Sequence, residues 1–144
     1  MVGLISLQEQ IAKFLDLHGV GIFEPYDVTG DIFIDCLPLK PVEAIGVYVT
    51  IVDEPNFAHE EQNITIQCLI RSADKFTALN KGQRIIKLLN GFNDSQYVMN
   101  GHHIIDTLAT NGLPVYLGTD QNNYHEYSVS FEIDYVKEDI IYGY

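Results

Sequence analysis

The chain has 144 residues, which fits one domain, so we expect a single domain over 1–144 in which 137–144 forms an extended C-terminal tail. Its 47% hydrophobic and 19% charged residues are typical of a soluble globular protein, and no apolar run is long enough to predict a membrane helix. The net charge of −12, from 20 acidic and 8 basic residues, repels phosphate backbones and argues against sequence-specific nucleic-acid binding.

The N-terminal stretch MVGLISLQEQ lacks the basic start and long apolar run of a secretory signal, so we expect the chain to stay in the cytoplasm where it is made. Its two cysteines, Cys36 and Cys68, are then expected to be reduced. Both lie in apolar, strand-like runs without CxxC spacing. The pattern predicts two ordinary core residues and neither a disulfide nor a redox pair.

The first predicted element is an amphipathic helix over residues 6–18. Ser6 and Glu9 have the spacing of a capping box, and an apolar stripe follows them at helical spacing. Gly19 stands where a left-handed residue commonly ends a helix. The stripe consists of Leu7, Ile11, Phe14, Leu15 and His18.

Three segments with alternating apolar residues come next, and they predict strands over 31–37, 44–52 and 63–72. The acidic segment 53–62 between the last two is expected to be an exposed loop. We expect the second and third strands to pack one face each on a common core. Those faces carry Ile45, Val47, Val49 and Ile51 on one strand, and Ile64, Ile66, Cys68 and Ile70 on the other.

A second amphipathic helix is predicted over 73–90, capped by Ser72 and ended by Gly91. Gly82 lies on its apolar side, at a cost of about 1 kcal/mol in helix propensity, so it is expected to permit a close approach to the sheet. Five of the eight basic residues of the chain lie between positions 71 and 87, and three of them line the outer side of this helix: Lys81, Arg84 and Lys87.

Three further strands are predicted over 102–109, 113–119 and 124–136. In the last, large apolar residues alternate with polar ones, which is typical of a strand with one buried face and one wet face. The element order therefore predicts an α+β fold, with a mostly antiparallel sheet and two amphipathic helices packed on one face (α-β-β-β-α-β-β-β). The other face is left free to meet a partner.

The sequence predicts no catalytic residue, no cofactor site and no metal site. His102 and His103 are adjacent, so on a strand they point to opposite faces. His59, Glu60 and Glu61 lie in the predicted loop without the HExxH spacing of a zinc helix. P-loop, GxGxxG and GxSxG motifs are absent from the whole sequence.

The segments GIFEPYDVTGDIFIDCLPLKPVEAIGVYVT, NITIQCLIRS and ADKFTALNKGQRIIKLLNGF resemble the minor capsid or tail-terminator family of siphophages, and the likeness covers residues 6 to about 136. It is carried by the N-terminal helix, by a strand ending in Leu37 and Pro38, and by a strand ending in Arg71 before a helix that closes on LLNG. That family has no active site to transfer.

The resemblance implies a virion protein of the tail or neck, assembled in the host cytoplasm. It implies a ring, usually a hexamer, that caps the tail tube, stops its polymerisation and joins tail to head. Its partners are further copies of the chain, the major tail tube protein and a head connector or stopper protein. DNA passes through the lumen without specific binding, and no membrane is involved.

Two other readings remain open. One is a different head-completion or connector protein of the phage neck. The other is a small cytoplasmic ligand-binding domain or enzyme, which would need a polar cluster inside an apolar pocket, whereas the predicted strands have almost entirely aliphatic inner faces.

The unequal charge distribution predicts how subunits meet. In a ring each subunit offers two different surfaces to its neighbours, so a basic and an acidic patch favour head-to-tail contact. Rim ion pairs contribute only about 0–1 kcal/mol each, so apolar burial must supply most of the stability. The predicted interface residues are Lys81, Arg84, Lys87 and Leu88 on the helix, and Glu126, Glu132 and Asp134 on the wet face of the last strand.

Overall fold

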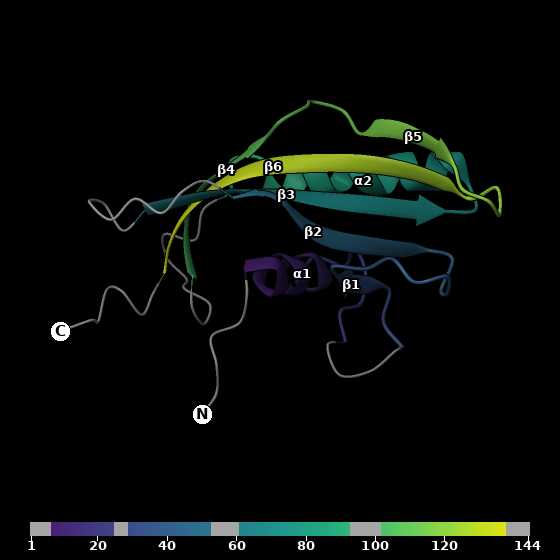
Figure 1. Ribbon diagram of the computed structural model, residues 1–144, viewed down its shortest axis with the longest axis horizontal. Coiled ribbons are helices and arrows are strands. Elements are labelled where there is room, and N and C mark those ends of the chain that lie inside the picture. Colours follow the sequence, from purple (N-terminus) through teal and green to yellow (C-terminus); the bar gives the residue numbers. More distant parts are fainter. Residues whose placement is uncertain (1–6, 25–28, 53–60, 93–101, 138–144) are drawn as a thin grey trace.

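The computed structural model describes residues 7–24, 29–52, 61–92 and 102–137, and it contains two helices and six strands (Figure 1). Their order, α-β-β-β-α-β-β-β, confirms the predicted α+β class. The elements are α1 (Leu7–Leu17), β1 (Ile32–Ile34), β2 (Ala44–Val52), β3 (Glu61–Ser72), α2 (Lys75–Leu89), β4 (His102–Ala109), β5 (Val115–Thr119) and β6 (His125–Lys137).

The strands form one sheet in the order β1-β2-β3-β6-β4, and β5 also pairs with β6. Among the described strands, β1 and β2 run parallel to each other, and the other pairs are antiparallel. β4 pairs with the C-terminal half of β6 and β5 with its N-terminal end, so both occupy the same edge of β6. The predicted, mostly antiparallel sheet is confirmed.

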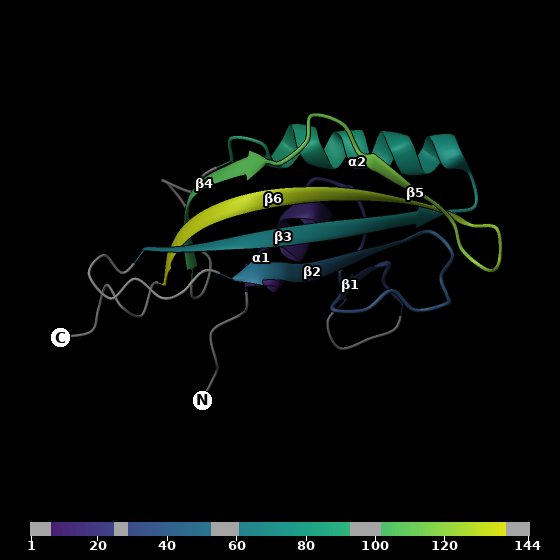
Figure 2. The ribbon, with the colours of Figure 1, turned by 45° about the horizontal axis from the view of Figure 1, so that its top comes forward.

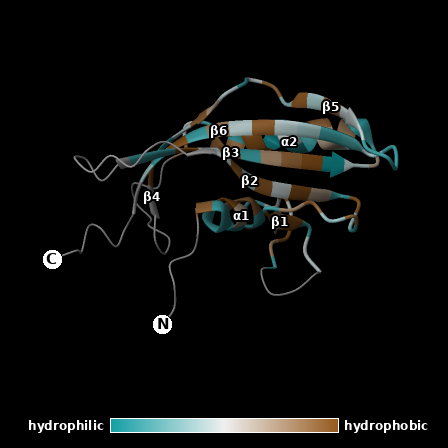
Figure 3. Cartoon of the chain, in the orientation of Figure 1, coloured by the Kyte–Doolittle hydropathy of each residue, from teal (hydrophilic) through white to brown (hydrophobic). Residues whose placement is uncertain are grey.

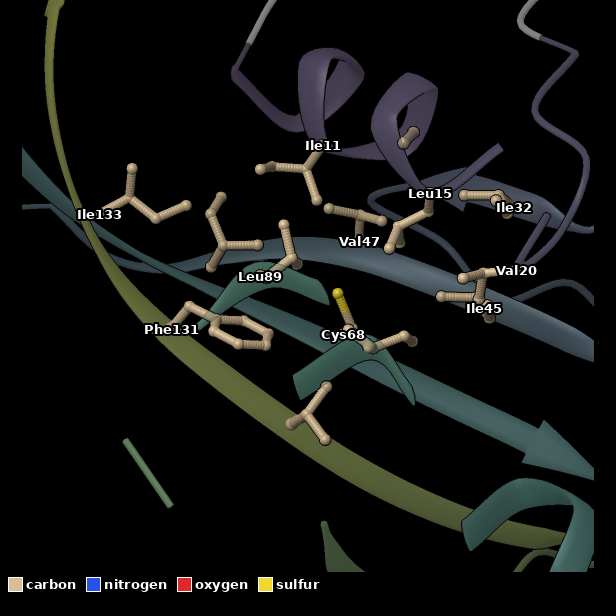
Figure 4. Close-up of a cluster of buried hydrophobic side chains, with 14 of the residues drawn as sticks. Ile11, Leu15, Val20, Ile32, Ile45, Val47, Cys68, Leu89, Phe131 and Ile133 are labelled. Carbon is tan, nitrogen blue, oxygen red and sulfur yellow. The ribbon is translucent and has the colours of Figure 1, made fainter. Parts of the chain in front are cut away.

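The core lies on one face of this sheet. The register aligns Val47, Cys68 and Val129 across β2, β3 and β6, and all three are buried. α1 packs against β1 and β2, whereas α2 packs against β3, β6 and β4, so the two helices share the apolar face between them (Figure 2). Side chains from both helices and from the three long strands meet in one cluster (Figure 4).

α1 contacts the residues that follow α2. The ring of Phe14 packs at a tilt against that of Phe92, with 4.4 Å between ring centroids. Gly19 has a φ of +74°, which confirms its predicted role at the end of α1. His18, which was expected on the buried stripe, is instead exposed and stacks on Phe14.

The start of α2 differs from the prediction. Ser72 remains in β3, paired with His125, so it cannot cap the helix, and its Oγ accepts a hydrogen bond from the Asp74 backbone. Asp74 is the N-cap: its carboxylate accepts from the Thr77 backbone N–H at 3.0 Å and from the Thr77 hydroxyl at 2.7 Å. Those bonds lower the pKa of Asp74. At the other end, Gly91 has a φ of +81° and follows the helix as predicted.

The strand predicted over 31–37 is wrong at its C-terminal end. Asp35 has a φ of +59°, a left-handed conformation that ends β1 after Ile34. Its carboxylate accepts a hydrogen bond from Gln8 of α1 at 2.7 Å, which holds the turn in place. Cys36, predicted to lie in the core, therefore follows the turn and is exposed.

The starts of β3 and β5 also differ from the prediction. Glu61 was placed in a loop but begins β3, because β6 is long enough to pair with it through Val136. β5 begins at Val115, since Pro114 has no N–H for the ladder and instead packs on α2. A Cβ on Gly82 would lie 2.8 Å from the Pro114 ring, so the close approach expected at Gly82 is made mainly by the connection between β4 and β5.

Several predictions lie outside the described residues. These are the capping serine Ser6, the loop residues His59 and Glu60, and the tail beyond Lys137. The backbone of Glu61 is described, but its side chain is not.

The two cysteines should differ sharply in reactivity. Cys68 is fully buried, and burial raises the pKa of its thiol to about 12, so almost no thiolate forms near neutral pH. Cys36 is exposed and free. A thiol reagent in mildly alkaline buffer should therefore modify one cysteine per native chain and both after denaturation. Two fast-reacting thiols in the native protein would contradict the burial of Cys68, and the Cys36→Ser variant should show none.

Candidate assembly surfaces

The described residues offer no site for metal chemistry. No group of three or more His, Cys, Asp or Glu side chains within them could hold a metal ion. His102 and His103 occupy successive positions of β4, opposite Lys137 and Val136. No helix in the described part of the chain is long and apolar enough to cross a membrane. The surface features that remain are two charged faces and one apolar edge.

The first is the face of the sheet turned away from the helices. On β6 its side chains alternate with the buried ones, as predicted, although Ser128 is itself largely buried. Glu132 is exposed there, whereas Asp134 is held by a hydrogen bond of 2.7 Å from Asn63 of β3. Glu126 lies at the opposite end of β6, near Tyr48, whose pKa is raised by burial and further by Cys36, Asp35 and this carboxylate. The three predicted acidic residues therefore line one strand but do not form a compact patch.

One corner of this face is closed by a buried arginine that sequence reasoning did not single out as structural. Arg71 is only 3% exposed. Its guanidinium donates to the carbonyl oxygens of Val42 at 3.0 Å and Pro41 at 2.8 Å, and to that of Pro38. These hydrogen bonds hold the connection between β1 and β2 against the end of β3.

The second surface is the outer side of α2. Lys87 is exposed and Lys81 is half-buried. Arg84 is exposed too, but its guanidinium donates to the carbonyl oxygens of Gly19 at 3.2 Å and His18 at 2.5 Å. It thus satisfies carbonyls at the C-terminus of α1, which corrects the view of this residue as purely outward-facing. Leu88 is partly buried against the protein's own core, which leaves little of it for a partner.

The third surface was not predicted. Among the residues whose burial is described, ten large hydrophobic side chains are exposed, and six of them lie between positions 105 and 117, on β4, β5 and their connection. Figure 3 shows brown, hydrophobic segments along β5. We call this surface the apolar ridge, and it consists of Ile105, Leu108, Leu113, Val115, Tyr116 and Leu117. In β5, a bulge next to Gly118 breaks the alternation, so consecutive side chains stay exposed.

A small polar and aromatic cluster fixes β5 against α2. The Tyr116 hydroxyl lies 2.9 Å from His125 Nδ1, and its ring centroid lies 5.0 Å from that of Tyr127. Lys75, in the first turn of α2, places its ammonium 4.5 Å from the centre of the Tyr116 ring. These contacts hold the β5 part of the ridge in position, and the Lys75 ammonium places a positive charge beside it.

A fixed apolar ridge that is exposed to solvent is a feature of a protein that assembles with other proteins. The family model of bacteriophage tail terminator proteins matches residues 17–137, so the chain belongs to that family. Membership makes it a structural component of a phage virion, at the tail or neck. The predicted resemblance is confirmed.

Solved structures share the fold. A chain from the virion of a native gene transfer agent (GTA) particle superposes with a TM-score of 0.59 at 12% sequence identity, covering 90% of this chain and 94% of that chain. At that identity the likeness concerns the fold alone. No curated protein sequence matches this one.

Proposed function

We propose that this protein caps the finished tail tube as a ring of identical subunits, ends tube polymerisation and joins the tail to the head. The observation that carries the proposal is the match to the tail terminator family over residues 17–137. Its partners are further copies of the chain, the major tail tube protein and a head connector or stopper protein. The ring assembles in the host cytoplasm before it enters the virion.

The charge of the protein suits a passage for DNA. A net charge of −12 supplies few attractive contacts for a phosphate backbone that moves through the lumen. We assign the protein no catalytic role, since its family is a structural one and the described surfaces are suited to contacts with proteins.

Negative-stain microscopy of the purified protein, alone and mixed with purified tail tubes, tests the capping role. Rings should appear at one end of the tubes, and tubes assembled in their presence should stop growing. The nearest alternative is a head-completion protein of the neck. Binding to DNA-filled heads, with no binding to tubes, would favour that alternative and contradict tube capping.

The charged faces suggest how the subunits keep their register. The outer side of α2 and the open face of β6 lie on opposite sides of the sheet, so head-to-tail contact could bring Lys81 and Lys87 near Glu126 and Glu132 of a neighbour. In this proposal Arg84 adds positive charge to the contact while it stays bonded to the end of α1. Asp134 adds negative charge while it stays bonded to Asn63.

The variant Lys87→Glu should weaken ring formation several-fold without unfolding the subunit, and Glu132→Lys in the same chain should restore part of the loss. Arg84 is left unchanged, because reversing it would also break its bonds to α1. Lys40→Glu is the matched control, since Lys40 is also exposed and the charge changes by the same amount. The mass of the assembled ring is measured at increasing salt concentration for each variant. If Lys87→Glu and Lys40→Glu weaken ring formation equally, the proposed charge register is wrong.

A further inference from the structure

The sheet ends in edges that differ in how they are covered. An uncovered edge strand exposes a row of unpaired N–H and C=O groups, and proteins usually block such edges. β4 is blocked by the residues after α2: Gly91 donates to the Thr107 carbonyl at 2.7 Å, and Asn90 accepts from the Ala109 N–H at 2.9 Å. These bonds protect the outer side of β4 near its C-terminal end.

The opposite edge of the sheet is blocked only in part. β1 pairs with β2 from Ile45 to Val47, and the Val47 carbonyl accepts from both the Asp35 backbone at 3.0 Å and the Gln8 side chain at 2.9 Å. Beyond Val47 no described residue pairs with the outer side of β2. The second half of β2, which includes the exposed Thr50, is thus an open edge.

β5 is the other open edge. It pairs with β6 alone, so within the described ranges its outer side has no partner strand. Val115 is 44% exposed and Leu117 is 53% exposed, so this open edge is also apolar. An edge that is unpaired and apolar is an aggregation hazard unless another chain covers it.

The two open edges lie on opposite sides of the sheet and are offset along the strands. β5 pairs with the first residues of β6, from His125 to Ser128. The open half of β2 pairs with the part of β3 that faces Ser130–Ile133, in the middle of β6. A contact between these edges in two copies joins unlike surfaces, which is the head-to-tail arrangement that closes into a ring.

One positive charge lies directly beside β5: the Lys75 ammonium, 4.5 Å from the centre of the Tyr116 ring. The described residues 102–137, which contain β5, otherwise carry five acidic residues (Asp106, Asp120, Glu126, Glu132, Asp134) and one basic residue (Lys137). Described residues of 7–37, which contain α1 and β1 beside β2, carry one basic residue (Lys13) and five acidic residues (Glu9, Asp16, Glu24, Asp31, Asp35). Lys75 is therefore the charge beside β5 that favours contact with the acidic segment next to β2 of a neighbour.

We infer that β5 of one subunit adds as an edge strand to the open half of β2 in the next subunit, with the apolar ridge buried at the contact. The occupant of the ridge is thus a second copy of this chain, and the sheet continues from subunit to subunit. The inference rests on the proposed ring and names the surfaces that build it. Main-chain hydrogen bonds would pair the two strands, and the side chains of Val115 and Leu117 would be buried at the contact.

Cross-linking between introduced cysteines tests this pairing. In a Cys36→Ser background, Leu117→Cys and Thr50→Cys are made singly and together, and assembled protein, free and on tail tubes, is treated with a short bifunctional maleimide. The chain with both cysteines should give a ladder of covalent oligomers, and each single variant should stay monomeric on a denaturing gel. Leu39→Cys combined with Thr50→Cys is the control, since Leu39 is more exposed than Leu117 but lies off the ridge.

Two results would overturn the inference while leaving the ring intact. Covalent dimers from Leu117→Cys alone would show that β5 pairs with β5. Rings that form normally while the double variant gives no ladder would show that the subunits meet elsewhere. If the Cys36→Ser protein forms no ring in solution or on tubes, the proposed function itself fails, and the edge pairing falls with it.

Discussion

A phage that lacks this protein is expected to assemble DNA-filled heads and tails of irregular, overlong length that do not join. Tube polymerisation has no intrinsic stop if the cap is missing, so the subunits keep adding while the supply lasts. Infectious titre should fall by several orders of magnitude, because a head without a tail cannot deliver its genome. Electron microscopy of the mutant lysate, with tail lengths measured, checks the result.

Complementation makes the test specific. The wild-type chain supplied in trans should restore both tail length and titre. Val115→Lys, which charges the apolar ridge, should restore much less than Leu39→Lys, which places the same charge on an exposed residue elsewhere. Tails of normal length in the mutant lysate, beside heads that leak DNA, would contradict tube capping and favour a head-completion role.

Replacing Arg71 by methionine is expected to destabilise the fold by about 3 kcal/mol, the largest effect on stability that we expect from a single polar side chain. Methionine keeps much of the buried stem but removes the donors that serve the carbonyls of Pro38, Pro41 and Val42. Those carbonyls would stay desolvated without partners. Urea unfolding should show the loss in the midpoint, and the melting temperature should fall by roughly 10 °C.

Arg84→Met is the matched control for this prediction. Arg84 also donates to two backbone carbonyls, but it is exposed, so water can replace its hydrogen bonds. We expect a cost of about 1 kcal/mol or less. Equal losses for the two variants would show that the burial of Arg71 adds nothing to the stability.

Short-range patterns were sufficient for most of the fold. Alternation along β3, β6 and β2 up to Val49 predicted which side chains face the core, because a strand with one buried face needs an apolar residue at every second position. The expectation that Ile51 shares this face is wrong, because a bulge after Val49 shifts the register and pairs Ile51 with Thr65 and Val52 with the core residue Ile64. The left-handed residues Gly19 and Gly91 were correctly placed for the same local reason, since a helix end requires a conformation that glycine adopts at little cost. The order and the ends of these helices and strands also predicted the family.

Contacts between distant residues decided the rest. Arg71 meets carbonyls 29 to 33 residues away in sequence, and Arg84 meets those of α1 more than 60 residues away, so neither spacing leaves a local pattern. The outer side of β5 is open because no described strand pairs with it, whereas Asn90 and Gly91 block β4. By itself, then, the sequence determined the elements, the faces of the strands and the family. The tertiary structure alone decided which charges are already engaged and which strand edges are free, because both depend on what chain folding brings alongside.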